Sequence, residues 1–363
     1  MAAGPPLLVR VVDVGQGDGL VVISPTGKAV MIDAGDRGAE REMLAELARA
    51  GVATLDLVVM THPHADHIGG MQRVLETVPT RLFLDPGFDH GSGMYARLLE
   101  HLEASGAQLL VARAGRRIDL GGGAALEVLA PREPLLTGTR SDANANSIVL
   151  RLTYGDTAML LTGDAEEPTE RRLLEAPEQV AADVLKVAHH GSAHSTHAPF
   201  LAAVRPRVAV ISCGADNKFD HPRPEALDRL AAAGAEVVRT DLHGTITLTS
   251  DARTWTVAVS RGDGPRGTVR ATEDPAAPRP PPRAPTLPDL NTASADDLMT
   301  VEGIGPAKAR AIVAWRDEHG PFPSVDALTA VPGIGAKTAA RIGEHFSVAL
   351  PGAPPEAGGE DTP

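Results

Sequence analysis

The fold is decided by residues 61–67, whose sequence is Thr61-His62-Pro63-His64-Ala65-Asp66-His67. Three imidazoles and one carboxylate within six positions are unusual for a protein surface and more so for a hydrophobic core. The run 55–60 before them is short, mostly apolar and rich in β-branched residues, so we expect a buried strand there. Metal-ligating side chains packed this densely after a strand indicate half of a metal site. The alternative is a histidine-rich polar loop that binds nothing.

The spacing of these side chains divides them between two metal positions. In extended backbone alternate side chains point the same way, so His62 and His64 can reach one ion together. We expect a helix over 68–78, which places Asp66 and His67 near a helix start, offset from the first pair and suited to a second ion. Nitrogen and carboxylate ligands fit Zn²⁺, Mn²⁺ or Fe²⁺ better than Ca²⁺. We therefore predict a cofactor of two divalent ions, zinc or manganese.

Further motifs occur along the chain in an order typical of a known family. They lie at residues 12–19, 31–35, 160–164, 185–192 and 221–222. Together with residues 61–67 they resemble the metallo-β-lactamase superfamily and, within it, the metallohydrolase domain of the ComEC family of DNA-uptake competence proteins. The resemblance covers about residues 7–260 and implies an αβ/βα sandwich of two sheets between helix layers.

The resemblance implies roles for residues outside the first motif. Asp164 would bridge the two metals, and His189 would bind the second. His190, the next residue, would contact the substrate phosphate or transfer a proton, or else pack beside the ligands. Asp33 would orient a histidine ligand, and Asp18 is a second candidate for such a supporting role. For Asp164 the alternative is a helix N-cap.

One histidine that many relatives have is absent here. Residues 141–147, before the strand that ends at Asp164, contain Asn144 and Asn146 but no histidine. The ComEC-like branch also has asparagines in this place. The first metal would then keep two histidines, the aspartate and an asparagine or aspartate oxygen, which makes Mn²⁺ plausible beside Zn²⁺. Asn144 and Asn146 could equally serve as turn residues.

Three residues are expected to act on the substrate: Asp66, His190 and His221. His221 precedes a proline in an element that matches the family's late motif. It either contacts a substrate phosphate or orders its own loop.

Length and composition bound the possibilities. The chain has 363 residues, so two domains are expected. Hydrophobic residues make up 43% of it but aromatic residues only 3%, so aliphatic side chains must build the core. The single cysteine, Cys213, excludes an intramolecular disulfide bond. The net charge of −13 argues against general electrostatic attraction to nucleic acid, so contact with DNA must be local or metal-assisted.

Nothing in the sequence predicts a membrane span or an exported protein. No stretch approaches roughly 18 uninterrupted apolar residues. The N-terminal residues lack the basic and apolar regions of a signal peptide. We therefore expect a cytoplasmic location, and the oligomeric state stays open.

Four segments are expected, in an α+β chain. Residues 1–260 alternate strand and helix patterns, 261–285 are a proline-rich linker, 286–349 a small all-α domain and 350–363 a disordered tail. The expected strands are 7–15, 19–25, 29–35, 55–61, 81–85, 124–130, 147–154, 157–162, 183–188, 208–213, 235–240 and 244–249. The expected helices are 38–50, 68–78, 94–104, 166–175, 198–204 and 224–233.

An internal repeat occupies the all-α segment. Residues 294–305 are echoed 30 positions later by 324–335, and each unit is a helix, a Gly-Ile-Gly turn and a second helix. Ser294 and Ser324 are natural N-caps. The repeat resembles the tandem helix-hairpin-helix domain of the ComEA family of competence DNA receptors.

Phosphates are expected at the two turns, where the amides that open the second helix face outward. The residues expected to bind DNA there, without reading its sequence, are Gly303, Ile304, Gly305, Lys308, Gly333, Ile334, Gly335 and Lys337. Between residues 287 and 349 the net charge is −3, however. The alternative is therefore a helical module for packing or dimerisation.

Three functions are compatible with these patterns. The first is a metal-dependent phosphodiesterase or nuclease, related to competence, whose hairpins tether DNA through its phosphates. The second is a metallohydrolase of a small ester, lactone or lactam, with the hairpins as a protein-interaction module. The third is a DNA-binding or scaffold protein with a relic site. We favour the first because both segments occur in one chain.

Overall fold

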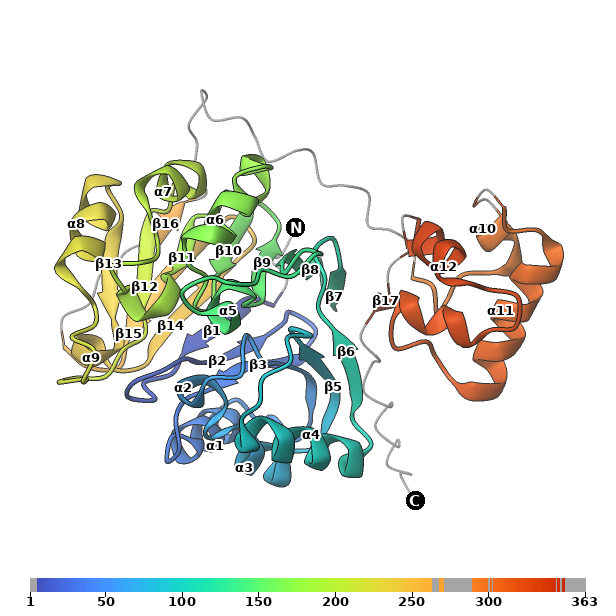
Figure 1. Cartoon of the computed structure of the whole chain (residues 1–363), viewed down its shortest axis with the longest axis horizontal. Helices are drawn as coiled ribbons and strands as arrows, with labels where there is room; N and C mark the ends of the chain where they lie inside the picture. Colours follow the sequence, from blue (N-terminus) through green and yellow to red (C-terminus); the bar gives the residue numbers. More distant parts are fainter. Residues whose placement is uncertain are drawn as a thin grey trace, which may run out of the picture.

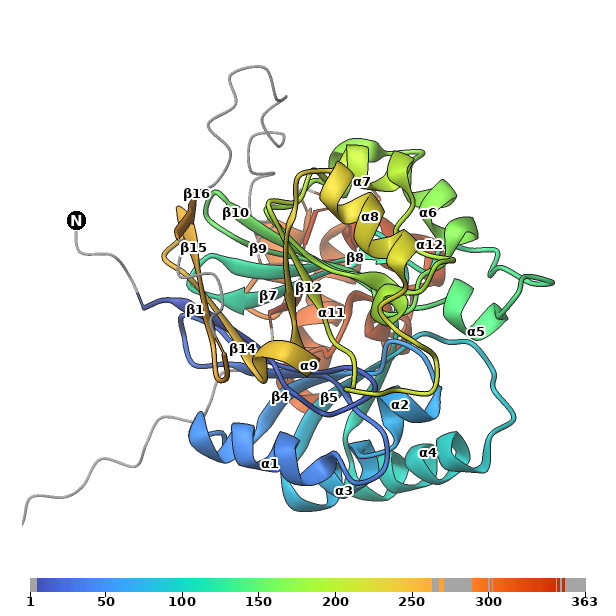
Figure 2. The same ribbon diagram turned by 90° about the vertical axis from the view of Figure 1, so that its left-hand side faces the viewer.

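The computed structural model describes residues 5–262, 268–270, 289–299, 301, 303–343, 345–346 and 348–349. Two β-sheets face each other with helices on their outer faces, and a smaller helical region follows (Figures 1 and 2). The predicted fold class is confirmed. Most of the predicted linker and the whole predicted tail lie outside the described residues.

The first sheet is mixed. Its neighbouring strands are antiparallel, except that those from β3 to β6 run parallel. Its nine strands have the order β16 (Thr268–Arg270), β15 (Thr254–Val259), β14 (Ile246–Ser250), β1 (Leu7–Val11), β2 (Gly19–Ile23), β3 (Ala29–Ala34), β4 (Leu55–Val59), β5 (Thr80–Asp85), β6 (Gln108–Val111).

The second sheet is also mixed. Its first four strands run parallel, the next pairs are antiparallel, and a short C-terminal strand joins the far edge in parallel. Its eight strands have the order β13 (Glu236–Arg239), β12 (Val208–Ile211), β11 (Val184–Lys186), β10 (Thr157–Leu161), β9 (Val149–Tyr154), β8 (Ala124–Ala130), β7 (Arg117–Gly121), β17 (Val348–Ala349).

Helices cover the two outer faces (Figure 2). Over the first sheet lie α1 (Glu40–Arg49), α3 (Met71–Thr77) and α4 (Gly93–Ser105), whose apolar side chains share one core with that sheet. Over the second sheet lie α6 (Glu167–Leu173), α7 (Ala198–Val204) and α8 (Pro224–Ala232). The short elements α2 (Ala65–Ile68), α5 (Asp142–Ala145), η1 (Pro177–Gln179), η2 (Ala188–Gly191) and α9 (Thr240–His243) connect them.

Three hydrophobic cores follow from the alternation of side chains along the strands. In β4, Leu57 and Val59 face the core between the sheets, whereas Val58 faces the helices. In β10, Met159 likewise points inward and Leu160 outward. A strand covered on both faces is mostly apolar, which explains the nearly continuous apolar runs of the sequence.

This topology brings polar side chains together at one edge of the sandwich. Asp33 lies in β3 and His62 follows β4, both from the first sheet. Asp164 follows β10 and His189 follows β11, both from the second. Ligands of open α/β sheets bind outside the carboxyl ends of parallel strands, and the predicted site residues gather there.

The helical region has its own core, to which residues from Leu290 to Phe346 contribute. It contains α10 (Ala295–Met299), α11 (Pro306–His319), the 3₁₀ helix η3 (Val325–Ala330) and α12 (Ala336–Gly343). Ser294 and Ser324 accept hydrogen bonds from the amides of Asp297 and Ala327, so both predicted N-caps are confirmed. β17 and an ion pair between Arg116 and Asp326 connect this region to β7 and the segment before it (Figure 1).

Several local predictions were wrong. Strands β6, β7, β15, β16 and β17 were not expected, and β16 falls inside the predicted linker. The expected helix 68–78 is divided into α2 and α3. A Cβ on Gly69 would lie 2.4 Å from the Arg37 amide nitrogen, and one on Gly70 would lie 2.5 Å from the Ala34 carbonyl oxygen. These glycines let the backbone pass close to the end of β3.

In the part of the chain that the structure describes, no helix combines the length and the apolar character needed to cross a bilayer.

Candidate metal centre

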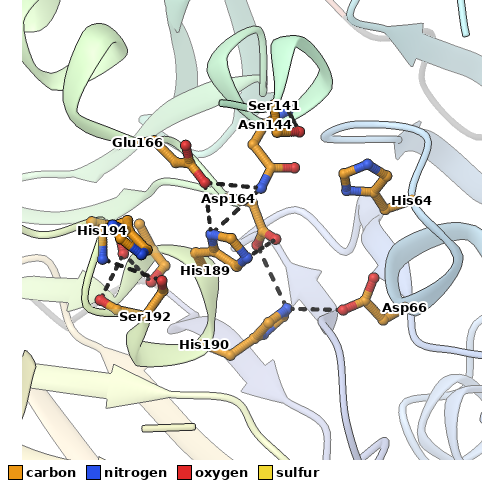
Figure 3. A network of polar contacts seen from close by, with 12 residues as sticks. His64, Asp66, Ser141, Asn144, Asp164, Glu166, His189, His190, Ser192 and His194 are labelled. Atoms are coloured by element: carbon orange, nitrogen blue, oxygen red, sulfur yellow. Dashed lines mark hydrogen bonds and ion pairs between the residues drawn. The ribbon is translucent and has the colours of Figure 1, made fainter. Parts of the chain in front are cut away.

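The carboxylate of Asp164 lies at the middle of the candidate site (Figure 3). Its Oδ2 atom is 3.7 Å from His62 Nε2 and 3.6 Å from His189 Nε2. Its Oδ1 atom is 3.2 Å from His67 Nε2 and 3.6 Å from His190 Nε2. Each oxygen therefore faces its own pair of imidazoles, so the carboxylate lies between two groups of possible metal ligands, which are called the first and the second position below.

The first position is formed by His62, His64 and Asp164, whose donor atoms lie within 4.8 Å of one another. His62 Nε2 is 2.9 Å from His64 Nδ1, and the two rings meet edge to face. His62 is fully buried, and its Nδ1 lies 3.2 Å from the Thr61 hydroxyl. As expected from their spacing, His62 and His64 converge.

The second position is formed by Asp66, His67 and His190, again within 4.8 Å of one another. Asp66 Oδ2 is 3.2 Å from His190 Nε2. The other nitrogen of His67, Nδ1, lies 2.8 Å from Asp33 Oδ2. Asp33 also accepts hydrogen bonds from the amide and hydroxyl of Thr61, so it fixes the His67 ring with Nε2 facing the site.

His190 is held by a buried ionic network. Its Nδ1 lies 3.0 Å from the Ser212 carbonyl oxygen, which can only accept, so Nδ1 donates and Nε2 is the nitrogen that faces the site. The same Nδ1 is 3.2 Å from Asp18 Oδ1, which is 2.9 Å from Lys186 Nζ. Asp18 and Lys186 are 2% and 1% exposed, so this pair is excluded from water.

The loop that contains Asp18 packs against the α2 turn. A Cβ on Gly17, whose φ is +124°, would lie 2.0 Å from the Asp66 carbonyl oxygen. The Asp18 amide donates to that same oxygen at 3.1 Å. Gly17 is therefore required for this close approach, and the 12–19 motif packs against the turn that carries Asp66 and His67.

The donor atoms of the second position fit a metal ion. Within the described part of the chain, His67 Nε2, His190 Nε2 and Asp164 Oδ1 are buried and form no hydrogen bond, although His67 Nε2 lies 3.2 Å from Asp164 Oδ1 and His190 Nε2 lies 3.2 Å from Asp66 Oδ2. Buried polar atoms without a hydrogen bond are costly, and a cation between these neighbours would satisfy them. Imidazole nitrogens and carboxylate oxygens suit zinc, manganese or iron.

The electrostatics also favour a cation. Burial disfavours the charged form of His190, but the carboxylates of Asp164 and Asp18 outweigh it and raise its pKa to about 10. Burial favours the neutral form of Asp164, but the neighbouring imidazoles hold its pKa well below the usual range. For Asp18, Lys186 and His190 similarly outweigh burial and lower the pKa to about 2. The site thus attracts positive charge, from protons or from metal ions.

The backbone of His189 and His190 is not extended. Their φ angles are +51° and +54°, in the left-handed region that non-glycine residues rarely adopt. This turn sends His190 to Asp66 and His67, where His189 was expected. His189 instead faces the Asp164 oxygen shared with His62. Such backbone strain clusters at functional sites.

Glu166 is a site residue that the sequence did not reveal. Its Oε1 is 3.3 Å from His189 Nδ1 and 3.4 Å from Asn144 Nδ2 (Figure 3). It is 3% exposed and is the N-cap residue of α6. An N-cap was the alternative role considered for Asp164, and the structure gives that place to Glu166. Its place two residues after Asp164 was the signal available. Glu166 orients the His189 ring as Asp33 orients His67.

The two asparagines have different surroundings. Asn146 donates to the carbonyls of Leu136 and Asp142 and accepts from the Leu136 amide, so it orders the preceding loop. Asn144 lies 3.4 Å from His189 Nδ1, and its buried Oδ1 has no hydrogen-bond partner in the described residues. Only Asn144 remains a candidate at the site.

His221 lies beyond the two late histidines. Its ring centroid is 5.6 Å from that of His189 and 6.2 Å from that of His190. Burial and the two histidines lower its pKa to about 4. Asn217 holds the backbone of His221 by hydrogen bonds to its amide and carbonyl groups. His221 is near the proposed ligands, but none of the histidine contacts of Asp164 in the described residues involves it.

The hairpin turns have the conformation expected of them. Gly303 and Gly333 have φ angles of +84° and +87°, which permit the tight turns. Ile304 and Ile334 are each 4% exposed and belong to the helical core, so their side chains anchor the turns. Gly305 and Gly335 immediately precede α11 and α12 and are exposed, which leaves room for a phosphate.

The two turn lysines differ. Lys308 is half-buried and donates to the Gly303 carbonyl oxygen at 3.2 Å. Lys337 is exposed and stands at a position one residue earlier in its repeat. Lys337 is therefore the lysine available to a phosphate in this conformation.

Two family profiles match the chain. That of the metallo-beta-lactamase superfamily covers residues 12–215, and that of the helix-hairpin-helix motif covers residues 288–347.

Curated relatives match each part. "ComE operon protein 3" of Bacillus subtilis is 28% identical over 268 residues, which are 69% of this chain and 34% of that protein. "Competence protein ComA" of Neisseria gonorrhoeae is 32% identical over 240 residues, 66% of this chain and 31% of that protein. "ComE operon protein 1" of Bacillus subtilis is 40% identical over 62 residues, 17% of this chain and 30% of that protein. The chain spans about a third of the length of these relatives.

Solved structures resemble the sandwich. The metallo-beta-lactamase fold protein YhfI from Bacillus subtilis has a TM-score of 0.45 and 14% identity, covering 68% of this chain and 100% of that one. CmlA, a diiron beta-hydroxylase from Streptomyces venezuelae, has a TM-score of 0.47 and 16% identity, covering 68% of this chain and 54% of that one.

Proposed function

Because this chain belongs to the metallo-β-lactamase superfamily, we propose that it is a metal-dependent phosphodiesterase that cleaves DNA and serves competence. Two features support the proposal. Buried histidine and aspartate clusters suit a metallohydrolase with two metal ions. A helix-hairpin-helix motif, which implies non-specific DNA binding, follows in the same chain. One relative over the sandwich carries the name "Competence protein ComA".

The ligand set is assigned from the two oxygens of Asp164. The pair that faces Oδ2 belongs to the first ion and the pair that faces Oδ1 to the second. His62, His64 and His189 would hold the first ion and Asp66, His67 and His190 the second, with the Asp164 carboxylate available to both. His189 thereby replaces the histidine that the segment 141–147 lacks.

The remaining polar residues prepare these ligands. Asp33 and the Ser212 carbonyl accept from Nδ1 of His67 and His190, so both Nε2 atoms face inward and would bind a metal once it displaces their protons. Glu166 does the same for His189. Two bound divalent ions would polarise a phosphodiester, supply hydroxide near neutral pH and stabilise the leaving oxygen. His221 is positioned beside the late histidines to contact a substrate phosphate.

The hairpins raise the concentration of DNA near the sandwich. Exposed amides at the starts of α11 and α12 bind phosphates and do not read bases, so affinity is independent of sequence. A tethered substrate reaches the metals at an effective concentration set by the connection between the two regions. β17, which follows the hairpins in the chain, pairs with β7 of the second sheet, and this pairing supports a position of the hairpins close to the sandwich.

One observation carries the proposal: the single buried carboxylate whose two oxygens each face two imidazoles. Hydrolysis of bis(p-nitrophenyl) phosphate and single-stranded DNA by the full chain with Mn²⁺ or Zn²⁺ tests it. We expect both activities, and we expect Asp66→Ala to abolish them. Asp89→Ala, an exposed aspartate in the loop after β5, is the matched control and should keep them.

Two other outcomes would overturn the proposal. Activity confined to lactones, lactams or small esters would assign the site to small molecules and the hairpins to protein contacts. A purified protein that retains no metal and cannot be loaded would indicate a DNA-binding protein with a relic site.

A further inference from the structure

Phe219 is an exposed aromatic side chain beside the metal centre. It is 45% exposed, whereas the other exposed large hydrophobic residues of the described chain, Leu109, Val111 and Leu242, are aliphatic. The whole sequence contains only six phenylalanines. In a chain with so few aromatic residues, a phenyl ring left in water needs a reason other than the core.

The ring is held outward by its loop. Asn217 Oδ1 accepts hydrogen bonds from the amides of Phe219 and His221, at 3.1 Å and 3.0 Å. Asn217 Nδ2 donates to the carbonyls of Gly214 and His221, at 2.9 Å and 2.5 Å. Asp220, between the two rings, has a φ of +56°. The Asn217 side chain therefore fixes the backbone of the loop from which the exposed Phe219 ring projects.

A series of rings connects Phe219 to the ligands. Phe219 and His221 are stacked, with centroids 5.7 Å apart and an interplanar angle of 24°. His221 is in turn 5.6 Å from His189. A group that lies on Phe219 is thus two ring contacts away from a proposed metal ligand. A base on Phe219 would therefore belong to a nucleotide close to the scissile phosphate.

The charge beside the ring matches a nucleotide as well. Lys218 Nζ lies 4.9 Å from the centroid of the Phe219 ring, so a cation covers one part of the phenyl surface. The neighbouring Asp220 is paired with Arg223 at 3.1 Å. A π surface next to a lysine is the combination with which proteins hold single-stranded nucleic acid, the base on the ring and the phosphate on the cation.

We propose that Phe219 is a stacking platform for a nucleobase, and that the substrate is single-stranded DNA or a frayed DNA end. The inference rests on the proposed nuclease function and adds the substrate class. Inside a duplex both faces of each base are covered by neighbouring pairs, so only an unstacked base or one at a strand end can lie on Phe219. A phenyl ring accepts any base, so no sequence preference is expected. Lys218 moves from the ring to a phosphate when the base binds.

The test compares a thymidine 12-mer with a 12-mer of the same backbone that has tetrahydrofuran in place of every base. Stacking on an aromatic side chain favours a base-bearing strand by about tenfold or more. We expect the full-length protein to hydrolyse the thymidine strand with a kcat/KM higher by that factor. Phe219→Ala should lose the preference, and Phe219→Trp should keep it. Leu242→Ala, at another exposed apolar residue, is the control and should also keep it.

Binding gives a second measurement that does not depend on cleavage. A strand that carries 2-aminopurine, mixed with metal-free protein, should lose fluorescence when its base stacks, and Phe219→Ala should reduce this quenching. Equal hydrolysis of the two 12-mers by the unaltered protein would overturn the stacking proposal and leave the nuclease proposal standing. Hydrolysis of neither strand would instead overturn the nuclease proposal on which it rests.

Discussion

The metal centre and the hairpin region place their polar groups in opposite ways. The centre is made of ionisable side chains buried away from water: His62, His67, Asp164 and Lys186 are between 0% and 2% exposed. The hairpins have an apolar core and offer backbone amides at the surface. In the first region function depends on the identity of each side chain, and in the second on the path of the backbone.

This difference predicts different responses to substitution. A buried charge has a few fixed partners, so its removal leaves those partners uncompensated. An exposed amide at a helix start is present whatever the side chain of that residue. Because the hairpin occurs twice, one copy can still bind phosphate when the other is altered. We therefore expect large, specific losses in the centre and small, partly redundant losses in the hairpins.

The largest effect is expected for Asp164→Asn. The amide has the size of the carboxylate but only one acceptor oxygen, so it cannot serve both metal positions. Phosphodiesterase activity should fall by at least about 10³-fold, because charge stabilisation of several kcal/mol is lost. Elemental analysis should find less metal bound per chain.

Asp228→Asn on α8 is the matched control, since this carboxylate is exposed. Its metal content and activity should equal those of the unaltered protein. Full metal content in Asp164→Asn would contradict the bridging role, whatever the activity.

The next effect is on stability. In Lys186→Met, Asp18 keeps its buried charge and loses its nearest cation, at 2.9 Å, whereas His190 Nδ1 remains 3.2 Å away. Breaking a buried ion pair costs about 3–5 kcal/mol of unfolding free energy, and the remaining histidine should keep the loss near the lower end of that range. Urea denaturation of the metal-free protein measures it. The double variant Lys186→Met with Asp18→Asn removes the stranded charge and should recover part of the loss; no recovery would mean that Lys186 contributes by packing alone.

The sequence predicted the part of the centre that is local. His62, His64, Asp66 and His67 converge because a strand end and a helix start fix their directions within a few residues. The role of Asp164 came from the resemblance to the superfamily, and the residue lies just beyond the apolar strand β10. The sandwich was predictable for the same reason, since its central strands are apolar on both faces.

What the sequence did not predict depends on the backbone or on distant partners. The directions of His189 and His190 follow from two left-handed residues, which no propensity scale indicates. Glu166 acts through contacts with Asn144 and His189 that only the folded chain creates. Strand β6 was missed because it is a short edge strand with three of its four residues exposed.

A smaller effect is expected at the hairpin turn. Gly333 has a φ of +87°, and nothing lies within 4 Å of a Cβ placed on it, so the cost of Gly333→Ala is that of the backbone conformation alone. That cost is about 1–2 kcal/mol. DNA affinity should fall only modestly because the Gly303 turn remains. Filter binding and thermal unfolding measure the two quantities.

Gly335→Ala is the natural comparison, two residues further along. Its Cβ also meets nothing within 4 Å, and its φ lies outside the left-handed region, so stability should hardly change. If Gly333→Ala were as nearly neutral as Gly335→Ala, the turn would tolerate alanine, and its glycines would serve close approach of a ligand.

The smallest effect, and the sharpest test of the hairpins, concerns salt. Lys337 is exposed, whereas Lys308 is bound to the Gly303 carbonyl, so one phosphate contact is expected from Lys337. For single-stranded DNA each such contact contributes about 0.7 to the slope of log affinity against log salt concentration. Lys337→Gln should lower the slope by that amount, equally for any sequence. Arg41→Gln on α1, which is also exposed, should leave it unchanged. An unchanged slope for Lys337→Gln would mean that the amides alone hold the phosphate, and the hairpins would then depend on no charged side chain at this turn.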